Sequence, residues 1–560
     1  MAETSPPPPQ SDFDKAAQSG WFARFLSGVE WLGNLLPHPV TLFAIFALSI
    51  VLISGIAGWF ELAVDDPRPE GASGRAADGL IRAVSLMNGD GLRRIVENLV
   101  TNFTNFVPLG TVLVAMLGVG VAEHSGLLSA LIRSLVLRPE GSKKAPTGIF
   151  GAIRRVLAKV FSPIVKHSLI ISIVFAGVIS NTASEMGYVV LVPLAGVIFH
   201  SLGRHPLAGM AAAFAGVSGG YSANLLIGTV DPLLAGITQE AAQLIDAEYT
   251  VHAAVNWYFM MVSTALITVV GSWVTVKIVE PRLGTYDDRD ADPSVQGGVS
   301  VEHVTDLERK GLRWAGISVV LFSLLLAALV VPESGVLRNP ETGAVLGSPF
   351  LRGIVTFIFV FFLIPGAVYG KVVGTVRSDK DVVDGMAQAM STLGLYIVIV
   401  FFAAQFVAFF RWTNLGAILA VQGSEFLQTI GLTGPEVFVP FILMCCFVNL
   451  MLGSASAQWA VTAPIFVPML MLIGYSPEVI QAAYRIGDST TNIITPMMSY
   501  FGLILAFAAK YDKRMGIGTI IATMLPYSML FLLGWIILFY VWVFVLGLPV
   551  GPEAPTFYTP

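Results

Sequence analysis

Two stretches of this chain repeat one order of apolar and polar segments, and this order limits what the chain can fold into. In the second half, apolar runs at 438–452 and 460–473 flank the polar stretch Gly453-Ser-Ala-Ser-Ala-Gln-Trp459. At about 1.5 Å per residue each run covers roughly 22 Å, which is short of the roughly 30 Å of a full membrane crossing. We therefore predict that the two runs are the arms of a re-entrant hairpin.

The first half contains a matching hairpin. Its apolar arms at 164–179 and 186–201 flank the polar tip Ser180-Asn-Thr-Ala-Ser184-Glu185. A proline at the first helical position indicates that a helix starts after each hairpin, at His205-Pro206 and at Ser476-Pro477.

Glycine and small polar residues are expected to interrupt both of these helices. The first interruption is predicted at 216–224 and the second at 487–492, after which the second helix resumes to about Lys510. Irregular backbone at membrane depth is tolerated only where it is buried in protein or lines a cavity, so paired interruptions indicate the binding site of a secondary transporter. The alternative, two thin crossings with an exposed tip in place of each hairpin, stays open because the charge distribution fits both.

The composition indicates a membrane protein. Of the 560 residues, 55% are hydrophobic and only 12% are charged, and the mean hydropathy is +0.75, so we expect an all-α polytopic fold. The net charge of -5 gives no indication of nucleic-acid binding. The two cysteines, Cys445 and Cys446, are adjacent, so we expect them to pack rather than to form a disulfide or a metal site, and we expect no cofactor.

Basic residues orient the chain in the membrane. The loop from 133 to 166 contains eight Lys and Arg against the single Glu140, which places it in the cytoplasm by the positive-inside rule. Counting the membrane crossings on both sides of this loop predicts about nine transmembrane helices plus two re-entrant hairpins. The two hairpins then open to opposite faces of the membrane, so the two halves of the chain are inverted repeats with broken helices. The N-terminus is then cytoplasmic and the C-terminus periplasmic, in the cell inner membrane.

These expectations divide the chain into six parts. They are a disordered tail at 1–30, scaffold or dimerisation helices at 31–135, a first transport unit at 163–245, further scaffold helices at 254–411, a second transport unit at 435–510 and a last helix at 516–547.

Polar residues at the tips and interruptions are suited to binding a hard cation, because side-chain oxygens and freed carbonyls are its preferred ligands. Two clusters are candidates for sodium sites: Asn181, Ser184, Ser218 and Asn224 in the first half, and Ser454, Ser456, Asp488, Thr491 and Asn492 in the second. The alternative for any one of them is a hydrogen bond between helices, as is expected for the single amides Gln405 and Asn449.

Arg485 and Asp488 are charged residues inside an apolar region. Each would cost about 2.5 to 3.5 kcal/mol at the centre of a membrane helix, so both must face protein or water. Three residues apart on one helix, they can neutralise each other. The interpretation we prefer gives Arg485 to a substrate carboxylate and Asp488 to a cation.

Three other residues carry open alternatives. Trp459 can stack on an aromatic substrate or on Arg485, or can serve only in packing. Asp231 and Glu185 can carry a proton or bind a cation, and Asp231 can instead cap the helical piece that begins at Pro232.

Several motifs together resemble the AbgT family, transporters of p-aminobenzoyl-glutamate. They are Pro108-Leu-Gly, Gly118-Val-Gly-Val-Ala-Glu-His-Ser-Gly126, Ser180-Asn-Thr-Ala, Gly219-Gly-Tyr-Ser-Ala-Asn-Leu, Ala404-Gln-Phe, Gly453-Ser-Ala-Ser-Ala-Gln-Trp459 and Arg485-Ile-Gly-Asp-Ser-Thr-Thr-Asn-Ile-Ile-Thr-Pro496. The resemblance covers nearly all of 30–548. It implies homodimers and a place in the wider group of ion transporters that includes sodium-coupled dicarboxylate carriers.

The resemblance also implies functional importance for Asp231, Trp459, Pro477 and Arg485. With Ser456 and Asn181 these form the predicted substrate-binding set. The implied substrate is a folate breakdown product, an aromatic amide that bears a glutamate, which fits Arg485 beside Trp459. Some members resemble exporters of sulfonamide drugs, so the direction of transport stays open.

We therefore predict a cation-coupled secondary transporter, with proton-driven efflux of sulfonamide-type antimetabolite drugs as the alternative. Two other classes fit less well. An ion channel would need a continuous polar pathway, whereas the polar residues here gather at two places. An enzyme would need a nucleophile with its base or a metal site, and no His or Cys lies near the tips.

Overall fold

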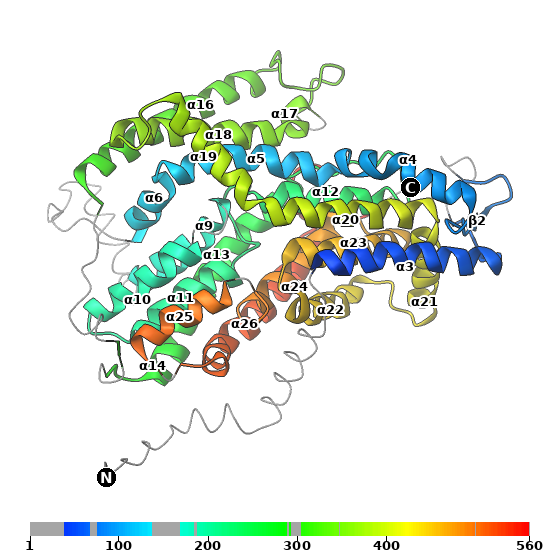
Figure 1. Cartoon of the computed structure of the whole chain (residues 1–560). Helices are drawn as coiled ribbons and strands as arrows, with labels where there is room; N and C mark the ends of the chain where they lie inside the picture. Colours follow the sequence, from blue (N-terminus) through cyan, green and yellow to red (C-terminus); the bar gives the residue numbers. More distant parts are fainter. Residues whose placement is uncertain are drawn as a thin grey trace, which may run out of the picture.

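The structure is a computed structural model of the chain. It describes residues 39–67, 75–136, 168–183, 187–287, 291–292, 304–345, 348–498, 500–513 and 515–558. The predicted N-terminal tail, most of the basic loop, and Ser184 and Glu185 at the first tip lie outside the described residues. The described residues form long helices packed side by side (Figure 1).

Among the described residues, the first part of the chain contains four helices and a short ribbon. Their bounds are α3 Pro39–Trp59, β1 Ala63–Asp65, β2 Leu80–Arg82, α4 Gly89–Thr104, α5 Val107–His124 and α6 Leu127–Val136. The two strands pair antiparallel, with Val64 opposite Ile81. Asn88 caps α4, because its side chain accepts a hydrogen bond from the backbone N–H of Gly91.

The first hairpin and the interrupted helix after it follow the predicted order. Their elements are α9 Ser168–Ser180, η1 Asn181–Ala183, η2 Gly187–Leu191, α10 Val192–Ser201, α11 Pro206–Phe214, η3 Ala215–Gly219 and α12 Val230–Ala242. The helix that starts at Pro206 continues through the π-helical turn η3, and the interruption that follows spans 220–229. The predicted range of 216–224 therefore begins a few residues too early. Gly216 serves close packing, since a Cβ there would lie 2.4 Å from the carbonyl oxygen of Val174 in α9.

The middle of the chain supplies further long helices. Their bounds are α13 Trp257–Val274, η4 Thr275–Val279, α14 Glu280–Leu283, α16 Asp306–Val330, α17 Pro349–Arg352, α18 Ile354–Val373, α19 Asp379–Thr392, α20 Gly394–Trp412 and α21 Leu415–Thr429. A capping box of Thr305 and Glu308 begins α16.

The second hairpin and its interrupted helix close the chain. The elements are η6 Pro435–Val437, α22 Phe438–Leu452, α23 Ala455–Leu472, α24 Pro477–Asn492, α25 Phe501–Tyr511, α26 Ile517–Phe539 and η7 Tyr540–Val545. The tip between α22 and α23 is only Gly453 and Ser454, which is shorter than predicted. Trp459 consequently lies inside α23 and not in the tip.

The second interruption was predicted in the wrong place. Helix α24 continues through Gly487 to Asn492, and the interruption spans 493–500. Gly487 is needed for packing, since a Cβ there would lie 2.5 Å from Cβ of Cys445 in α22. Within the helix, the hydroxyl of Thr491 donates to the carbonyl of Gly487 one turn earlier. The helix ends ahead of Pro496, which lacks an N–H and restricts the residue before it.

Nine helices among the described residues are long and apolar enough to cross a membrane, so the chain is an all-α polytopic membrane protein. Seven of them are predicted crossings. The other two are the hairpin arms α22 and α23, whereas each interrupted helix is divided into shorter pieces. Re-entry of the hairpins stays a prediction.

The two hairpins open at opposite ends of the helical bundle. The open end of the first lies beside α25, where the rings of His200 and Tyr511 are 6.1 Å apart. The open end of the second lies beside the C-terminal segment, where the N–H of Tyr558 donates to the carbonyl of Gly474 over 2.9 Å. Helix α26 runs from the first of these ends toward the second (Figure 1). This arrangement is the one expected of inverted repeats.

Candidate functional site

A cavity of about 140 Å³ lies where the two halves of the chain meet. Its lining comes from η2, from both interruptions, from the start of α12 and from the tip of the second hairpin. The lining residues include Tyr188, Tyr221, Val230, Leu233, Gly453, Ser454, Ser456, Asn492, Met498 and Tyr500. Irregular backbone of both halves therefore faces one cavity, as the paired interruptions predict.

Three tyrosines give this cavity aromatic walls. The rings of Tyr188 and Tyr500, one from each half, stack with centroids 4.8 Å apart and planes 3° from parallel. Tyr221 follows the first interruption's glycines and lines the same cavity. None of the three is among the site residues predicted from the sequence. Tyr221 lies inside the predicted first interruption, Tyr188 three positions after the first tip, and Tyr500 eight positions after the second predicted interruption.

Arg485 is paired with Asp231 of the other half. Nη2 of Arg485 lies 2.6 Å from Oδ1 of Asp231, and the two side chains are only 2% and 1% exposed. Nε of Arg485 donates to Oδ1 of Asn256 over 3.0 Å. The predicted alternative of pairing with Asp488 is therefore wrong for this structure, because α12 brings a closer carboxylate. Nη1 of Arg485 has no partner among the described residues.

Asp231 also organises its own backbone. Its Oδ2 accepts a hydrogen bond from the N–H of Gly228 over 2.6 Å. The predicted alternative, in which Asp231 caps a helix that begins at Pro232, is wrong for this structure, because α12 begins at Val230 and Asp231 lies inside its first turn. The same carboxylate also neutralises Arg485.

Trp459 is fully buried in α23, away from the cavity. Its Nε1 donates to Oγ1 of Thr238 over 2.8 Å, and its ring stacks on Tyr484 with centroids 4.2 Å apart. The expected alternative of stacking on Arg485 is wrong for this structure. Pro477 occupies the first turn of α24, where the hydroxyl of Ser476 accepts from the N–H of Val479, as predicted for a helix start.

A buried hydrogen-bonded network joins these groups. The hydroxyl of Thr238 lies 2.5 Å from Oε1 of Gln481, and Nε2 of Gln481 donates to Oδ1 of Asn256 over 2.7 Å. Asn256 in turn accepts from Arg485, so α12, α23 and α24 are tied together at one place. Thr238, Asn256 and Gln481 are not among the site residues predicted from the sequence. One local signal was available, since Gln481 lies one turn before Arg485 on the same helix face.

In the first predicted ion cluster, most polar atoms already have a hydrogen-bond partner within the protein. Nδ2 of Asn181 donates to the carbonyl of Val217 over 2.9 Å, and Oδ1 of Asn224 accepts from the hydroxyl of Thr182 over 2.8 Å. The hydroxyl of Ser218 lies 3.3 Å from Sδ of Met498. Only Oδ1 of Asn181 is without a partner in the part of this cluster that the structure describes.

The second cluster is organised by Asn449. Its Nδ2 lies 2.8 Å from the backbone carbonyl of Asp488, 2.9 Å from Oγ1 of Thr491 and 2.8 Å from Oδ1 of Asn492. The hydroxyls of Ser454 and Ser456 are 3.4 Å apart at the tip. Among the described residues no donor lies at normal hydrogen-bond distance from either carboxylate oxygen of Asp488, although the side chains of Asn492 and Arg485 on the same helix interact with its charge.

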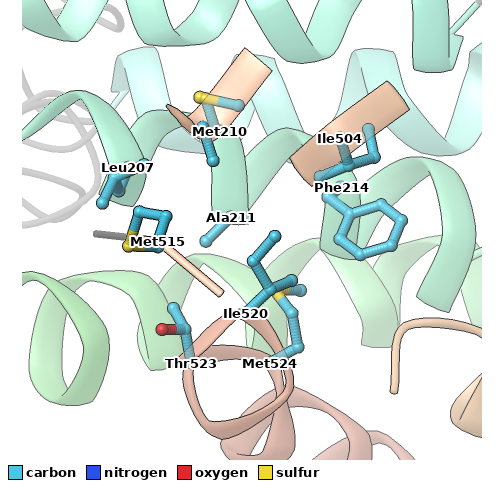
Figure 2. Close-up of a pocket in the computed structure, with 10 residues that line it drawn as sticks. Leu207, Met210, Ala211, Phe214, Ile504, Met515, Ile520, Thr523 and Met524 are labelled. Atoms are coloured by element: carbon cyan, nitrogen blue, oxygen red, sulfur yellow. The ribbon is translucent and has the colours of Figure 1, made fainter. Parts of the chain in front are cut away.

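Figure 2 shows a different, apolar pocket of about 30 Å³ between α11, α25 and α26. Thr523 supplies the only side-chain oxygen among its labelled residues. A pocket of this size and polarity does not offer the groups that a charged conjugate needs.

Irregular backbone from two oppositely directed halves, facing one cavity inside a bundle of membrane helices, defines a multi-span membrane transporter. The sequence matches the family described as "AbgT putative transporter family" over residues 24–153 and 141–558. The chain belongs to this family, and membership implies transport rather than catalysis.

Three relatives cover nearly the whole chain. The p-aminobenzoyl-glutamate transport protein of Escherichia coli (strain K12) is 35% identical over 543 residues, which are 97% of this chain and 98% of that protein. The structure of Neisseria gonorrhoeae MtrF, of a class of antimetabolite efflux pumps, is 60% identical with a TM-score of 0.84, over 95% of this chain and all of the other. The Alcanivorax borkumensis YdaH transporter is 44% identical with a TM-score of 0.80, over 92% of this chain and all of the other.

Proposed function

We propose that this chain moves p-aminobenzoyl-glutamate, or a similar aromatic amino-acid conjugate, across the inner membrane and couples the movement to a cation. The observation that carries this proposal is the cavity shared by the two halves, whose lining includes tyrosine rings and the polar tip of the second hairpin. The relative from Escherichia coli, named for p-aminobenzoyl-glutamate transport, supports the choice of substrate.

The cavity suggests how such a conjugate binds. The substrate ring lies against Tyr188, Tyr221 or Tyr500, because aromatic rings gain from stacking beyond their buried area. The polar groups of Ser454, Ser456 and Asn492 receive its amide and carboxylates.

Arg485 has a second role in this proposal. Its Nη1 has no partner among the described residues and donates to a glutamate carboxylate once the transport unit changes conformation. Trp459, Pro477 and Asp231 hold the Arg485 side chain in place. Asn181 is positioned at the first tip.

The remaining parts of the proposal concern coupling and assembly. Sodium is the proposed ion, since an anionic substrate and a cation neutralise each other as the loaded unit crosses the membrane. We also propose a homodimer, a cytoplasmic N-terminus, a periplasmic C-terminus, and a relation to the sodium-coupled dicarboxylate carriers.

Counterflow in liposomes tests the proposal. Purified protein should exchange labelled p-aminobenzoyl-glutamate in a saturable way. The Tyr500→Ala substitution should raise the half-saturating concentration roughly two- to twelvefold, because a stacked ring contributes about 0.5 to 1.5 kcal/mol. Tyr500→Phe keeps the ring and should stay near wild type, as should Tyr258→Ala, which lies away from the cavity. Absence of saturable exchange by wild-type protein would overturn the proposal.

A second candidate is proton-driven efflux of sulfonamide-type antimetabolites. The 60% identity with MtrF favours it, and both substrate types present an aromatic ring that fits the same walls. Cells that express this chain should then accumulate less sulfonamide, and collapse of the proton gradient should restore accumulation.

A further inference from the structure

Two apolar cavities lie next to each other between the first hairpin and the helices α16 and α18. Their volumes are about 190 and 240 Å³. Their linings share four residues, which are Thr182, Leu226, Phe361 and Phe362. We therefore treat them as one space and call it the lateral cavity. It shares no lining residue with the tyrosine-walled cavity of about 140 Å³.

The few polar groups in the lining of the lateral cavity already donate hydrogen bonds within the protein. Oγ of Ser180 and Nε1 of Trp257 donate to backbone carbonyls over 2.6 and 2.9 Å. Oγ1 of Thr182 donates to Oδ1 of Asn224 over 2.8 Å. The other lining residues are apolar. Ordered water and a charged conjugate both need several polar partners, whereas an apolar cavity of about 150 Å³ already accepts a small hydrocarbon. The lateral cavity therefore suits a hydrocarbon ligand.

The lateral cavity follows α16 through the depth of the membrane. Its lining on this helix begins at Leu312 and ends at Leu326. At about 1.5 Å per residue this stretch is about 21 Å long, which fits inside the roughly 30 Å of the hydrocarbon core. The length is that of an extended fatty acyl chain and not of a compact solute.

Helix α16 lies at the edge of the bundle and borders the lipid (Figure 1). Only 6% of its apolar stretch is buried inside the protein. Ile317, Leu321 and Leu324 are exposed on the face opposite the lateral cavity. The bilayer itself is therefore the source of hydrocarbon closest to this cavity.

The lateral cavity opens beside Gly316, next to a basic turn of α16. Gly316 lines the cavity and is exposed. Arg313 and Arg309 precede it by three and seven residues, so they lie on the same side of the helix. Both are exposed, and Arg309 also pairs with Asp306. A guanidinium group at the end of a membrane helix is suited to binding a lipid phosphate.

We infer that the lateral cavity binds one acyl chain of an anionic phospholipid, whose phosphate lies on Arg313. One wall comes from α9, the first tip and the interruption after it, and the other comes from α6, α16 and α18. The first wall belongs to the proposed transport unit and the second to the proposed scaffold. The lipid is thus a ligand of the contact between them, and its binding does not depend on which solute is transported.

Native mass spectrometry tests the inference on the purified full-length protein without any transported solute. After removal of co-purified lipid, the protein is titrated in detergent with dioleoyl phosphatidylglycerol. Wild type should bind one lipid per chain more tightly than any further lipid. Gly316→Leu should raise the half-saturating concentration for this lipid roughly tenfold, because the new side chain takes the place of several methylene groups in the cavity.

A matched variant separates filling of the cavity from a general effect of the substitution. No atom lies within 4 Å of the place that a Cβ would occupy at Gly316, and Leu favours a helix more than Gly does. Gly316→Leu should therefore fold, which its melting temperature checks. Gly518→Leu adds the same side chain at an equally open position of α26 that does not line the lateral cavity. It should bind the lipid as wild type does.

The phosphate contact is tested by comparing phosphatidylglycerol with phosphatidylcholine of the same chains. Wild type should bind the anionic lipid several-fold more tightly. Arg313→Gln should lose most of this preference and still bind one chain. Lys277→Gln removes an exposed cation from η4 and should keep the preference. Equal affinity of wild type for the two lipids would contradict the contact with Arg313.

Three results would overturn the inference. In the first, wild type has no lipid site tighter than the others, or Gly316→Leu binds the lipid as wild type does. In the second, a sulfonamide releases the bound lipid, because the lateral cavity would then be a solute site. In the third, Gly316→Leu changes the mass of the oligomer and not the number of bound lipids, because a second copy of the chain would then cover the cavity.

Discussion

At the scale of single residues, the charge of Arg485 is balanced by a carboxylate from the other half of the chain. The pair with Asp231 is almost completely shielded from solvent. Such a pair adds little net stability over an apolar replacement, but removal of one partner leaves a buried charge alone. The two halves are thus joined by an interaction that is costly to break.

Asp231→Asn should therefore destabilise the protein more than its small change in shape suggests. The Asn side chain still accepts a hydrogen bond from the N–H of Gly228, but the buried charge of Arg485 is left without a partner. The free energy of unfolding should therefore fall by about 3 to 5 kcal/mol, measured as a lower melting temperature. The double substitution Asp231→Asn with Arg485→Gln removes both charges and should recover part of this loss. If the double variant loses as much stability as Asp231→Asn and Arg485→Gln lose separately when added together, the pair is not coupled.

At the scale of elements, the tip of the second hairpin depends on Gly453. Its φ of +57° is in the left-handed region, and a Cβ there would lie 2.8 Å from backbone atoms of Met497 in the second interruption. The tip therefore touches the interruption with no room for a side chain. This contact holds Ser454 and Ser456 at the edge of the cavity.

A matched pair of glycine substitutions separates the cost of the left-handed backbone from the cost of the close approach between tip and interruption. Gly431 has a φ of +71°, but no atom lies within 4 Å of the place that a Cβ would occupy there, so Gly431→Ala should cost only the backbone term of about 1 to 2 kcal/mol. Gly453→Ala should lower the melting temperature further and should also impair counterflow. If both variants lose the same stability, the close approach of tip and interruption is not important.

At the scale of the whole molecule, the opposed hairpins lead to a prediction about orientation. The end of the bundle that holds the start of α26 should face the cytoplasm, and the C-terminal segment should face the periplasm. An alkaline phosphatase fusion after residue 558 should be active, and a fusion in the turn between α25 and α26 should be inactive. Green fluorescent protein at the same two positions should give the reverse pattern. Activity of alkaline phosphatase at the α25–α26 turn would reverse the proposed orientation.

The sequence by itself determined the class of fold, the order of hairpins and interrupted helices, and the helix starts at Pro206 and Pro477. These features depend on signals that act over a few residues. Apolar runs must be buried in lipid or protein, and a proline without an N–H is accommodated in the first turn of a helix.

Only the tertiary structure decided which groups meet. Arg485 pairs with Asp231 across 254 positions of sequence, Trp459 stacks on Tyr484, and Tyr188 meets Tyr500 at the cavity. It also decided that Gly487 lies inside a helix, because its missing Cβ makes room for α22 rather than breaking α24. The physical reason is that a side chain's partner is chosen by the packing of distant helices, which local propensity does not encode.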